Sequence, residues 1–298
     1  MLGGAGADLL EGGEGGDALE GGTEDDRLFG RAGGDTLLGG EGDDALDGGA
    51  GADLAEGGDG NDGLRDGDAG SPAASDTLAG GLGDDTLATA GGADLLDGGA
   101  DYDTAVLDRS SASAALSFLF AGAEAVTILE GDGTSVTGVE RLGLLGGGGD
   151  DAFLAGDGWD TLSGNDGADA LRGAGGNDSL LGGRGADALE GGLFRFLTPL
   201  AKRDRDTIED FDPALDRIEV SAAGFGGGLT EGMDLGTAGR FVVSASGAAT
   251  AAFAQLCYAT ALGELYWDAN GTAAGGRTLI AAVAGLPVLD ASDIAVVA

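Results

Sequence analysis

One large apolar residue recurs at almost every ninth position over three stretches of the chain, and mostly small or polar residues fill the positions between. Nonapeptides follow one another without a break from Gly3 to Arg65, resume from Gly80 to Val106, and resume again from Gly146 to Glu190, which gives fifteen units. Position eight of the unit is Leu or Phe in thirteen of them, with Ala55 and Ala105 as the exceptions. A period of this length indicates a stack of similar supersecondary units.

The remaining positions indicate what each unit forms. Position four is Gly in thirteen units, with Glu24 and Asp101 departing, and Gly lets the backbone turn tightly. The short segment after position six then forms a strand whose position-eight side chain faces inward. One unit supplies a turn and a strand, and two units complete a coil. We therefore expect an all-β fold, a parallel β-roll solenoid in two blocks with a β-rich C-terminal capping domain.

Position six is Asp in all fifteen units. Because two units make a coil, position-six residues two units apart should stack on one edge, at the spacing of neighbouring strands, roughly 4.8 Å. Carboxylates at that spacing repel one another unless a cation lies between them. The candidate metal-binding residues are therefore the position-six aspartates: Asp8, Asp17, Asp26, Asp35, Asp44, Asp53, Asp62, Asp85, Asp94, Asp103, Asp151, Asp160, Asp169, Asp178 and Asp187.

The charge of the chain favours the same cation. The whole chain carries 53 acidic and 14 basic residues, a net charge of −39. Residues 1–192 hold 40 acidic and 7 basic groups, a net of −33, and this region should not collapse as a bare polypeptide. Nucleic acid is excluded as a partner because it requires a basic surface. An anionic membrane surface would repel the chain for the same reason.

Composition also removes most enzyme classes. The chain has no histidine, so it has no Ser-His-Asp triad, no HExxH zinc site and no His-ligated metal. It has no GxSxG motif, and its single lysine, Lys202, leaves no GxxxxGK[ST] phosphate loop. The single cysteine, Cys257, cannot form an intramolecular disulfide. We therefore expect no catalytic constellation in this chain and no cofactor other than the cation.

The unit GGxGxDxUx, where U is a large apolar residue, resembles the haemolysin-type repeat of RTX (repeats-in-toxin) proteins. The resemblance covers about half of the chain in the repeats alone. It implies a β-roll in which Ca²⁺ lies between stacked turns, held by Asp carboxylates and turn carbonyls, and this ligand set suits a cation that prefers six to eight oxygens.

Pairing each position-six aspartate with the one two units further along gives nine candidate calcium sites. Five lie in the first stretch, one in the second and three in the third. The pairs are Asp8–Asp26, Asp17–Asp35, Asp26–Asp44, Asp35–Asp53, Asp44–Asp62, Asp85–Asp103, Asp151–Asp169, Asp160–Asp178 and Asp169–Asp187. On this scheme Asp8 and Asp62 each serve one site, whereas Asp26, Asp35 and Asp44 each serve two.

The breaks in the period predict four regions. Residues 1–106 form the first roll, with a loop at 66–79 that holds the poor unit SPAASDTLA. Residues 107–145 form a β-rich spacer, with strands in AALSFLF, AVTILE and TSVTGVERLGLL. Residues 146–192 form the second roll, which ends where Phe196 replaces the next position-six Asp. Residues 193–298 form a C-terminal domain with less glycine and more aromatic residues.

The C-terminal region resembles the secretion domain at the end of serralysin-like RTX exoproteins. The matching landmarks are Asp206-Thr207-Ile208, Asp210-Phe211, Asp216-Arg217-Ile218, Leu265-Tyr266-Trp267-Asp268 and Leu289-Asp290…Ile294. The resemblance implies an uncleaved signal for a type I exporter, and so a protein secreted to the outside of a Gram-negative bacterium. The alternative is a capping domain that only seals the open edge of the roll.

The beginning of the sequence and its apolar runs agree with that route. MLGGAGADLL has neither the basic segment nor the apolar core of a Sec signal peptide. The longest apolar run, Leu279 to Leu289, is interrupted by Gly285 and Pro287 and is too short to span a bilayer.

Three kinds of function fit these patterns. The first is a secreted calcium-binding module that folds when it meets calcium and catalyses nothing itself. The second is the C-terminal part of a secreted RTX hydrolase, a protease or lipase whose catalytic domain is encoded upstream. The third is an adhesin or surface-layer component that bridges through calcium. The sequence alone does not separate the first from the third.

Overall fold

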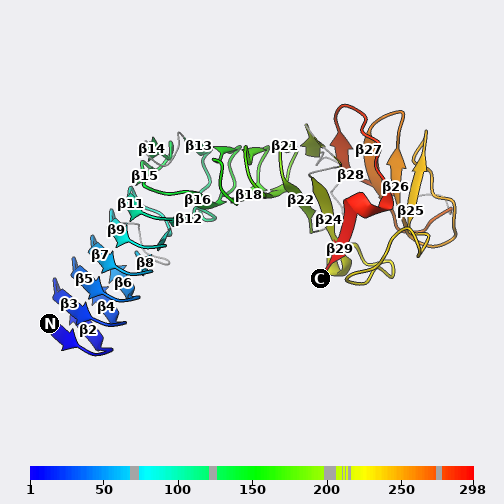
Figure 1. The fold of residues 1–298 in the computed structure, drawn as a ribbon. Coiled ribbons are helices and arrows are strands. Elements are labelled where there is room, and N and C mark those ends of the chain that lie inside the picture. Colours follow the sequence, from blue (N-terminus) through cyan, green and yellow to red (C-terminus); the bar gives the residue numbers. More distant parts are fainter. Residues whose placement is uncertain are drawn as a thin grey trace. The chain divides into compact units, whose positions relative to one another are not determined.

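The chain folds into two units made almost wholly of short β-strands (Figure 1). The computed structural model describes residues 1–67, 74–120, 126–197, 206–209, 211, 213, 216–272 and 277–298. The N-terminal unit comprises Met1–Ala112, Leu116–Leu145 and Ala155–Asp160, and the C-terminal unit comprises Ser113–Ala115, Gly146–Leu154 and Thr161–Ala298. In the described part of the chain, no helix has the length and apolar character needed to cross a membrane.

Alternate strands of the N-terminal unit form two parallel sheets, which is the arrangement of a β-roll. One sheet has the order β1-β3-β5-β7-β9-β11-β15, with β14 added antiparallel at its edge. Its strands are β1 (Leu2–Ala5), β3 (Ala18–Thr23), β5 (Thr36–Glu41), β7 (Leu54–Asp59), β9 (Thr77–Leu82), β11 (Leu95–Ala100), β15 (Ser135–Thr137) and β14 (Thr127–Ile128).

The second sheet of this unit has the order β2-β4-β6-β8-β10-β12-β16. Its strands are β2 (Leu9–Glu14), β4 (Arg27–Ala32), β6 (Ala45–Ala50), β8 (Gly63–Arg65), β10 (Thr86–Thr89), β12 (Thr104–Asp108) and β16 (Arg141–Leu145). A further short strand, β13 (Ser117–Leu119), meets Glu130 through an isolated antiparallel bridge at Ser117.

The register of the sheets follows from the period. Leu19 pairs with Leu37, its equivalent two units further on, and both are buried position-eight side chains. The predicted loop at 66–79 shifts this register without breaking it, because Leu54 pairs with Thr77, the equivalent residue of the poor unit. The position-eight residues, including Ala55, line the narrow core between the two sheets.

The strands run further than the sequence suggested, through the glycines that open the next unit. A typical strand, β3, begins at position seven of one unit and ends at position three of the next. Most glycines at positions two and four have positive φ, for example Gly40 and Gly42 at +125°. Glu24 and Asp101, the two departures at position four, adopt positive φ as well, at 74° and 87°. The backbone path is therefore kept where the glycine is not.

The predicted spacer at 107–145 continues the roll. Strand β15 pairs in parallel with β11, and β16 pairs in parallel with β12. The two sheets therefore extend past the last regular nonapeptide of the second stretch. Residues 121–125 of this region lie outside the described part of the chain.

The C-terminal unit begins with the same architecture. One sheet has the order β18-β20-β22-β24-β29, and the other has the order β17-β19-β21-β23-β28-β27-β26-β25. The strands of the first are β18 (Thr161–Asp166), β20 (Ser179–Arg184), β22 (Leu193–Phe196), β24 (Arg217–Ser221) and β29 (Ile294–Val297). Those of the second are β17 (Ala152–Leu154), β19 (Ala170–Arg172), β21 (Ala188–Glu190), β23 (Asp206–Ile208), β28 (Arg277–Val283), β27 (Glu264–Asp268), β26 (Gln255–Ala259) and β25 (Phe241–Ser244).

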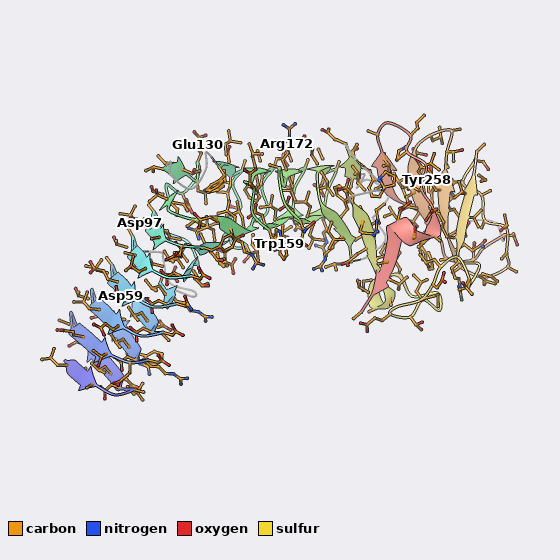
Figure 2. All side chains as sticks on the ribbon, viewed as in Figure 1. Asp59, Asp97, Glu130, Trp159, Arg172 and Tyr258 are labelled. Atoms are coloured by element: carbon orange, nitrogen blue, oxygen red, sulfur yellow. The ribbon has the colours of Figure 1, made fainter. Side chains whose placement is uncertain are left out.

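The roll does not stop at Gly191–Gly192, where the sequence placed its end. Strand β22 pairs in parallel with β20, and β23 pairs in parallel with β21. Buried Phe194 and Ile208 take over the core position there. The last sheet then changes to antiparallel pairs, β28 with β27 and β27 with β26, around buried Tyr258 (Figure 2). A four-residue helix, α1 (Ala222–Phe225), and a 3₁₀ turn (Ala291–Asp293) complete this region.

Candidate metal sites

The position-six aspartates lie inside the roll, and most other acidic residues lie outside it. Thirteen of the fifteen are buried, and Asp8 and Asp17 in the first coil are half-buried. In contrast, Asp59 and Asp97, at other positions of the unit, are exposed (Figure 2). Burying a carboxylate is costly unless it is paired or binds a metal. The burial of the position-six carboxylates therefore needs a specific explanation.

Most of the buried position-six carboxylates cap the turn of the preceding coil. The backbone N–H of Asp26 donates to Oδ1 of Asp44 at 2.7 Å, and the N–H of Asp44 donates to Oδ1 of Asp62 at 2.8 Å. Repetition of this bond produces two ladders in the N-terminal unit, which we call ladder A and ladder B. Ladder A runs through Asp8, Asp26, Asp44, Asp62, Asp85, Asp103 and Glu140. Ladder B runs through Asp17, Asp35, Asp53, Asp76, Asp94 and Thr134.

The ladders cross the interruption at 66–79, and this corrects the pairing inferred from the sequence. Asp62 was expected to serve a single site, but it is bonded on both sides, to Asp44 and, beyond the interruption, to Asp85. Asp76, which the nine pairs omitted, joins Asp53 to Asp94 in the same way. A strict spacing of two nonapeptides missed these steps because the inserted residues lengthen the coil.

A third ladder lies in the C-terminal unit and runs through Asp151, Asp169, Asp187 and Asp206. Asp206 thus continues the repeat, although the sequence placed it only among the landmarks of the C-terminal domain. The expected Asp160–Asp178 pair joins residues of different units. In the N-terminal unit, Oδ1 of Asp160 accepts from the N–H of Leu142 at 2.7 Å. Asp210, another landmark, lies outside the described residues.

A short sequence signal could have found the added ladder members. Asp76, Asp206, Glu140 and Thr134 each stand two positions before a buried aliphatic side chain: Leu78, Ile208, Leu142 and Val136. The pattern of an oxygen acceptor, any residue and a buried aliphatic is therefore more general than the nonapeptide.

The second carboxylate oxygen faces a small space beside the position-one glycine. A Cβ placed on Gly39 would lie 2.6 Å from the carbonyl oxygen of Gly57 and in contact with Oδ2 of Asp44. Gly39 has no positive φ, so the reason for glycine here is space and not backbone conformation. The same arrangement recurs at Gly3, Gly12, Gly21, Gly30, Gly57, Gly80, Gly98 and Gly146.

Several of these inward oxygens lack hydrogen-bond donors, whereas Oδ2 of Asp151 accepts from the N–H of Gly147 at 3.1 Å. Among the described residues, eight ladder aspartates have a buried Oδ2 that accepts no hydrogen bond: Asp8, Asp26, Asp35, Asp44, Asp62, Asp85, Asp103 and Asp169. A buried carboxylate oxygen without a donor is expensive, and here it lies beside a backbone carbonyl, which is a second acceptor. Two acceptors facing one space fit a cation.

The electrostatics of the ladders agree with this. Burial raises the pKa of Asp62, Asp103 and Asp169 to about 7, and neighbouring aspartates add to the effect. Burial likewise raises the pKa of Asp44 and Asp85. Without a cation, the roll therefore holds protons that the unfolded chain would release.

The oxygens identify the kind of metal. Within the described residues, no group of three or more Asp, Glu, His or Cys side chains gathers to hold a metal ion. Each site therefore depends on backbone carbonyls as well as carboxylates. Ca²⁺ accepts such mixed oxygen sets in flexible geometry, whereas Zn²⁺ prefers nitrogen and sulfur ligands. The residues fit Ca²⁺.

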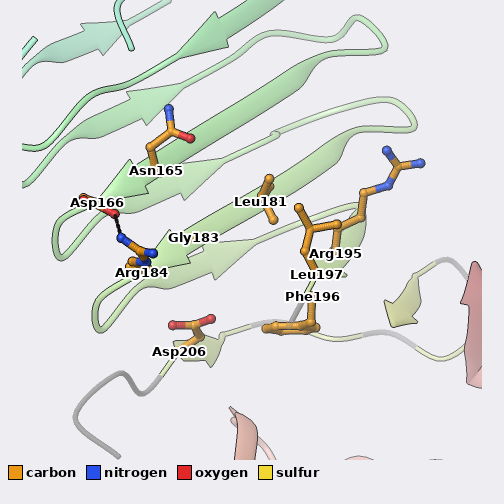
Figure 3. Close-up of a pocket in the computed structure, with 9 residues that line it drawn as sticks. All are labelled: Asn165, Asp166, Leu181, Gly183, Arg184, Arg195, Phe196, Leu197 and Asp206. Atoms are coloured by element: carbon orange, nitrogen blue, oxygen red, sulfur yellow. Dashed lines mark ion pairs between the residues drawn. The ribbon is translucent and has the colours of Figure 1, made fainter. Parts of the chain in front are cut away.

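A pocket of about 300 Å³ in the C-terminal unit lies where the repeats give way to β22 and β23 (Figure 3). Its lining includes Asp206 from the third ladder and the exposed ion pair of Arg184 with Asp166, at 3.6 Å. Arg195 also lines it, and its Nε donates to Glu219 at 2.9 Å. The charged side chains that line the pocket therefore already have partners within the protein: Arg184 pairs with Asp166, Arg195 pairs with Glu219, and Asp206 belongs to the third ladder.

A parallel roll whose turns face inward with carboxylate and carbonyl oxygens defines a calcium-binding β-roll protein. A family model described as the RTX calcium-binding nonapeptide repeat (four copies) matches residues 2–37, 29–64, 73–105, 144–171 and 163–195. The chain belongs to this family of RTX repeat proteins, whose repeats bind calcium. The β-roll and the family expected from the sequence are both confirmed.

The crystal structure of the extracellular lipase LipA from Serratia marcescens aligns with 91% of this chain at 20% identity and a TM-score of 0.30. The chain spans 40% of the length of that protein. No curated protein matches the chain.

The ladders predict how many bound calcium ions are lost when each aspartate is replaced. Asp35 and Asp62 each face two neighbouring coils, so Asp35→Ala and Asp62→Ala should remove similar amounts of bound calcium. Asp8→Ala should remove less, because Asp8 begins its ladder. Isothermal titration with calcium chloride measures the stoichiometry. Glu11→Ala and Glu56→Ala, which change exposed acids, are the controls. A loss in Glu56→Ala equal to that in Asp62→Ala would contradict the ladder scheme.

Calcium binding should weaken on acidification. The raised pKa values mean that the metal-free roll is stabilised by protons below about pH 4 and loses that contribution as the pH rises to 7. Calcium needs the deprotonated carboxylate. For a site with a pKa of about 7, the apparent Kd should rise about 25-fold between pH 7.5 and pH 5.5. Titrations in two buffers of different ionisation enthalpy should also show proton release at pH 6.5. An affinity independent of pH over this range would argue against these carboxylates as ligands.

Proposed function

We propose that this chain is a secreted calcium-binding module, whose repeat region folds when Ca²⁺ enters the turns between successive coils. One observation carries the proposal. At coil after coil, a buried Asp Oδ2 without a donor faces the carbonyl of a position-one glycine across a space that only glycine leaves open. The residues that would hold the ions are the ladder aspartates whose Oδ2 lies beside a position-one glycine, together with the position-one carbonyls, and Ca²⁺ would supply the positive charge between them.

The charge balance supports this role. Residues 1–192 carry a net charge of −33, and the ladders concentrate part of it in the interior. Apart from position eight, the unit offers little apolar surface to offset this repulsion. Ca²⁺ ions between the coils would cancel this repulsion. Their bonds to the carboxylates and carbonyls of neighbouring coils would then be the principal interaction that stabilises the fold.

The proposal assigns no chemistry to the chain itself. Most of the buried aspartates of the described residues belong to the ladders, where each member after the first accepts through its side chain from an N–H of the preceding coil. Their side chains therefore have fixed structural partners. An activity of a longer parent protein would reside in another domain.

Type I secretion is the second part of the proposal. RTX repeats are typical of proteins exported by that route, and the C-terminal region resembles the secretion domain of serralysin-like exoproteins. The resemblance includes Leu265–Asp268, which lies in β27, and Leu289–Asp290, which precedes β29. A type I channel passes unfolded chain, and a protein that folds only with calcium meets this requirement.

A single methyl group at position one tests the calcium sites. Gly39→Ala would place a Cβ in contact with Oδ2 of Asp44 and 2.6 Å from the Gly57 carbonyl oxygen, so it should remove at least one bound ion and weaken folding in calcium. Gly63→Ala is the matched control, because Gly63 also lies in a strand but its Cβ would meet no atom closer than 3.9 Å. Calcium stoichiometry and thermal unfolding in calcium measure both. If the two variants bind calcium equally well, the turn sites are wrong.

A further inference from the structure

The last aspartate of ladder B is one whose inward oxygen has a side-chain donor. Asp94 is a position-six aspartate and is buried, with 2% of its surface exposed. Its Oδ2 is absent from the set of donor-free buried oxygens that includes Asp85 and Asp103, because Arg109 donates to it. The Arg109 guanidinium is also buried, with a side chain only 3% exposed.

The guanidinium is held by several groups, which we call the Arg109 cluster: Arg109, Asp94, Asp132, Thr89 and Thr134. Nη2 of Arg109 lies 3.4 Å from Oδ2 of Asp94 and donates to Oγ1 of Thr134 at 2.7 Å. Nη1 donates to the carbonyl oxygen and to Oγ1 of Thr89, both at 3.1 Å. Nε donates to Asp132. One cation thus meets two carboxylates, two hydroxyls and two backbone carbonyls, the second being that of Asp108 at 3.3 Å.

Thr89 occupies position one of the Asp94 unit, where most units have glycine. In the regular coils, a Cβ at position one would fill the space between the aspartate Oδ2 and the next coil's carbonyl. A threonine at this position puts a branched side chain there. The space that fits calcium elsewhere is therefore closed at Asp94 by the protein itself.

From these contacts we propose that the Arg109 guanidinium takes the place of a calcium ion at Asp94. It supplies the positive charge that an ion supplies in the other coils, and it bridges from Asp94 to Thr134, which ends ladder B. Asp94 is then not a calcium ligand, although it carries the repeat's aspartate. The Asp94 carboxylate then has a positive partner at any calcium concentration. This inference rests on calcium binding at the other turns, as proposed above.

The proposal is tested by comparing two substitutions that keep side-chain size and the Oδ1 acceptor. Asp94→Asn should leave the number of calcium ions bound by the full chain unchanged. Asp85→Asn is the matched control, because Asp85 is equally buried, lies in ladder A and has a donor-free Oδ2. It should lose at least one ion. Equilibrium dialysis against calcium chloride, with circular dichroism of each variant in calcium, gives both the count and the folded fraction.

Three outcomes are informative. Loss of calcium in Asp85→Asn alone supports the proposal. Loss in both variants overturns it and leaves the proposed calcium function standing. Loss in neither overturns the calcium sites and, with them, the replacement at Asp94.

A calcium anomalous-difference map of wild-type crystals grown with calcium chloride gives a second test that no folding defect can disturb. We expect peaks at coordinating distance from Oδ2 of Asp85 and Asp103, and none at that distance from Oδ2 of Asp94. A peak beside Asp94 would overturn the proposal even if the variants failed to fold.

Discussion

Residues 1–192 are expected to lose their β structure in EDTA at pH 7.5 and to regain it in millimolar calcium. Their ladders bury carboxylates whose inward oxygens have no donor, and burial holds the pKa of Asp62, Asp103 and Asp169 at about 7. At pH 7.5 these groups must either ionise in the interior or leave it. Without a cation, unfolding relieves this cost.

The expected size of the effect is large. An ion at ten times its Kd stabilises the folded state by about 1.4 kcal/mol per site. One ion at each of the eight ladder aspartates with a donor-free Oδ2 would then contribute on the order of 11 kcal/mol in all, which is comparable to the stability of a whole domain. Extracellular calcium modules have a Kd of about 10⁻⁴–10⁻³ M. The transition should therefore fall in this range and should be absent at micromolar calcium.

Far-UV circular dichroism measures the change directly. Spectra in EDTA, in millimolar magnesium and in millimolar calcium should show a β-rich signal only in the last, because Mg²⁺ demands octahedral geometry and keeps much of its water. A variant that combines Asp26→Ala, Asp44→Ala and Asp62→Ala, which breaks ladder A, should need more calcium than the wild type. Identical β-rich spectra in EDTA and calcium would refute calcium-dependent folding.

Deletion of residues 259–298 should trap the protein inside a host supplied with a type I exporter. This segment contains β27, β28, β29 and the 3₁₀ turn at Ala291–Asp293, and it holds the last two landmarks of the serralysin-like secretion domain. In the folded protein the tail is engaged, since β29 pairs with β24 and Oγ of Ser221 donates to the carbonyl of Ala298. An exporter could read it only before the roll folds, which low intracellular calcium would ensure.

A second deletion separates loss of the signal from damage to the fold. Removing residues 36–53 takes out one coil, and the remaining strands keep their register because Thr36 pairs with Leu54. This variant should still reach the medium. Transfer of 259–298 to an unrelated slow-folding passenger should export the passenger. Export of the 259–298 deletion at wild-type level would require the secretion assignment to be withdrawn.

The tail would also decide the order of folding during export. It would emerge first, followed by the third ladder and then by ladders A and B. Each folded coil presents free strand edges to the next, so folding outside the cell would hinder return of the chain.

The sequence determined the repeating part of this protein, because a fixed period fixes the neighbours. When every coil consists of two nonapeptides, position eight must face position eight and position six must face position six in the next coil. The core residues Leu19 and Leu37 and the ladder step from Asp26 to Asp44 follow from counting alone. The expectation of a cation followed in turn, because position-six carboxylates stacked at the spacing of neighbouring strands repel one another.

Tertiary structure decided what lies outside the period. The step from Asp62 to Asp85, the continuation of the sheets by β15 and β16, and the entry of Asp206 into the third ladder all depend on insertions whose path no spacing gives. The sequence also could not predict the space beside the position-one glycines, because a backbone carbonyl of the next coil forms one side of it.

Arg109 shows the difference most clearly. In sequence it is an isolated basic residue in a spacer, and Asp94 is an ordinary repeat aspartate. Only the folded chain brings the guanidinium to within 3.4 Å of that carboxylate and closes the position-one space with Thr89. A period predicts contacts between equivalent positions, but it says nothing about a side chain that reaches a ladder from outside the repeat. That contact is set by the three-dimensional path of the chain.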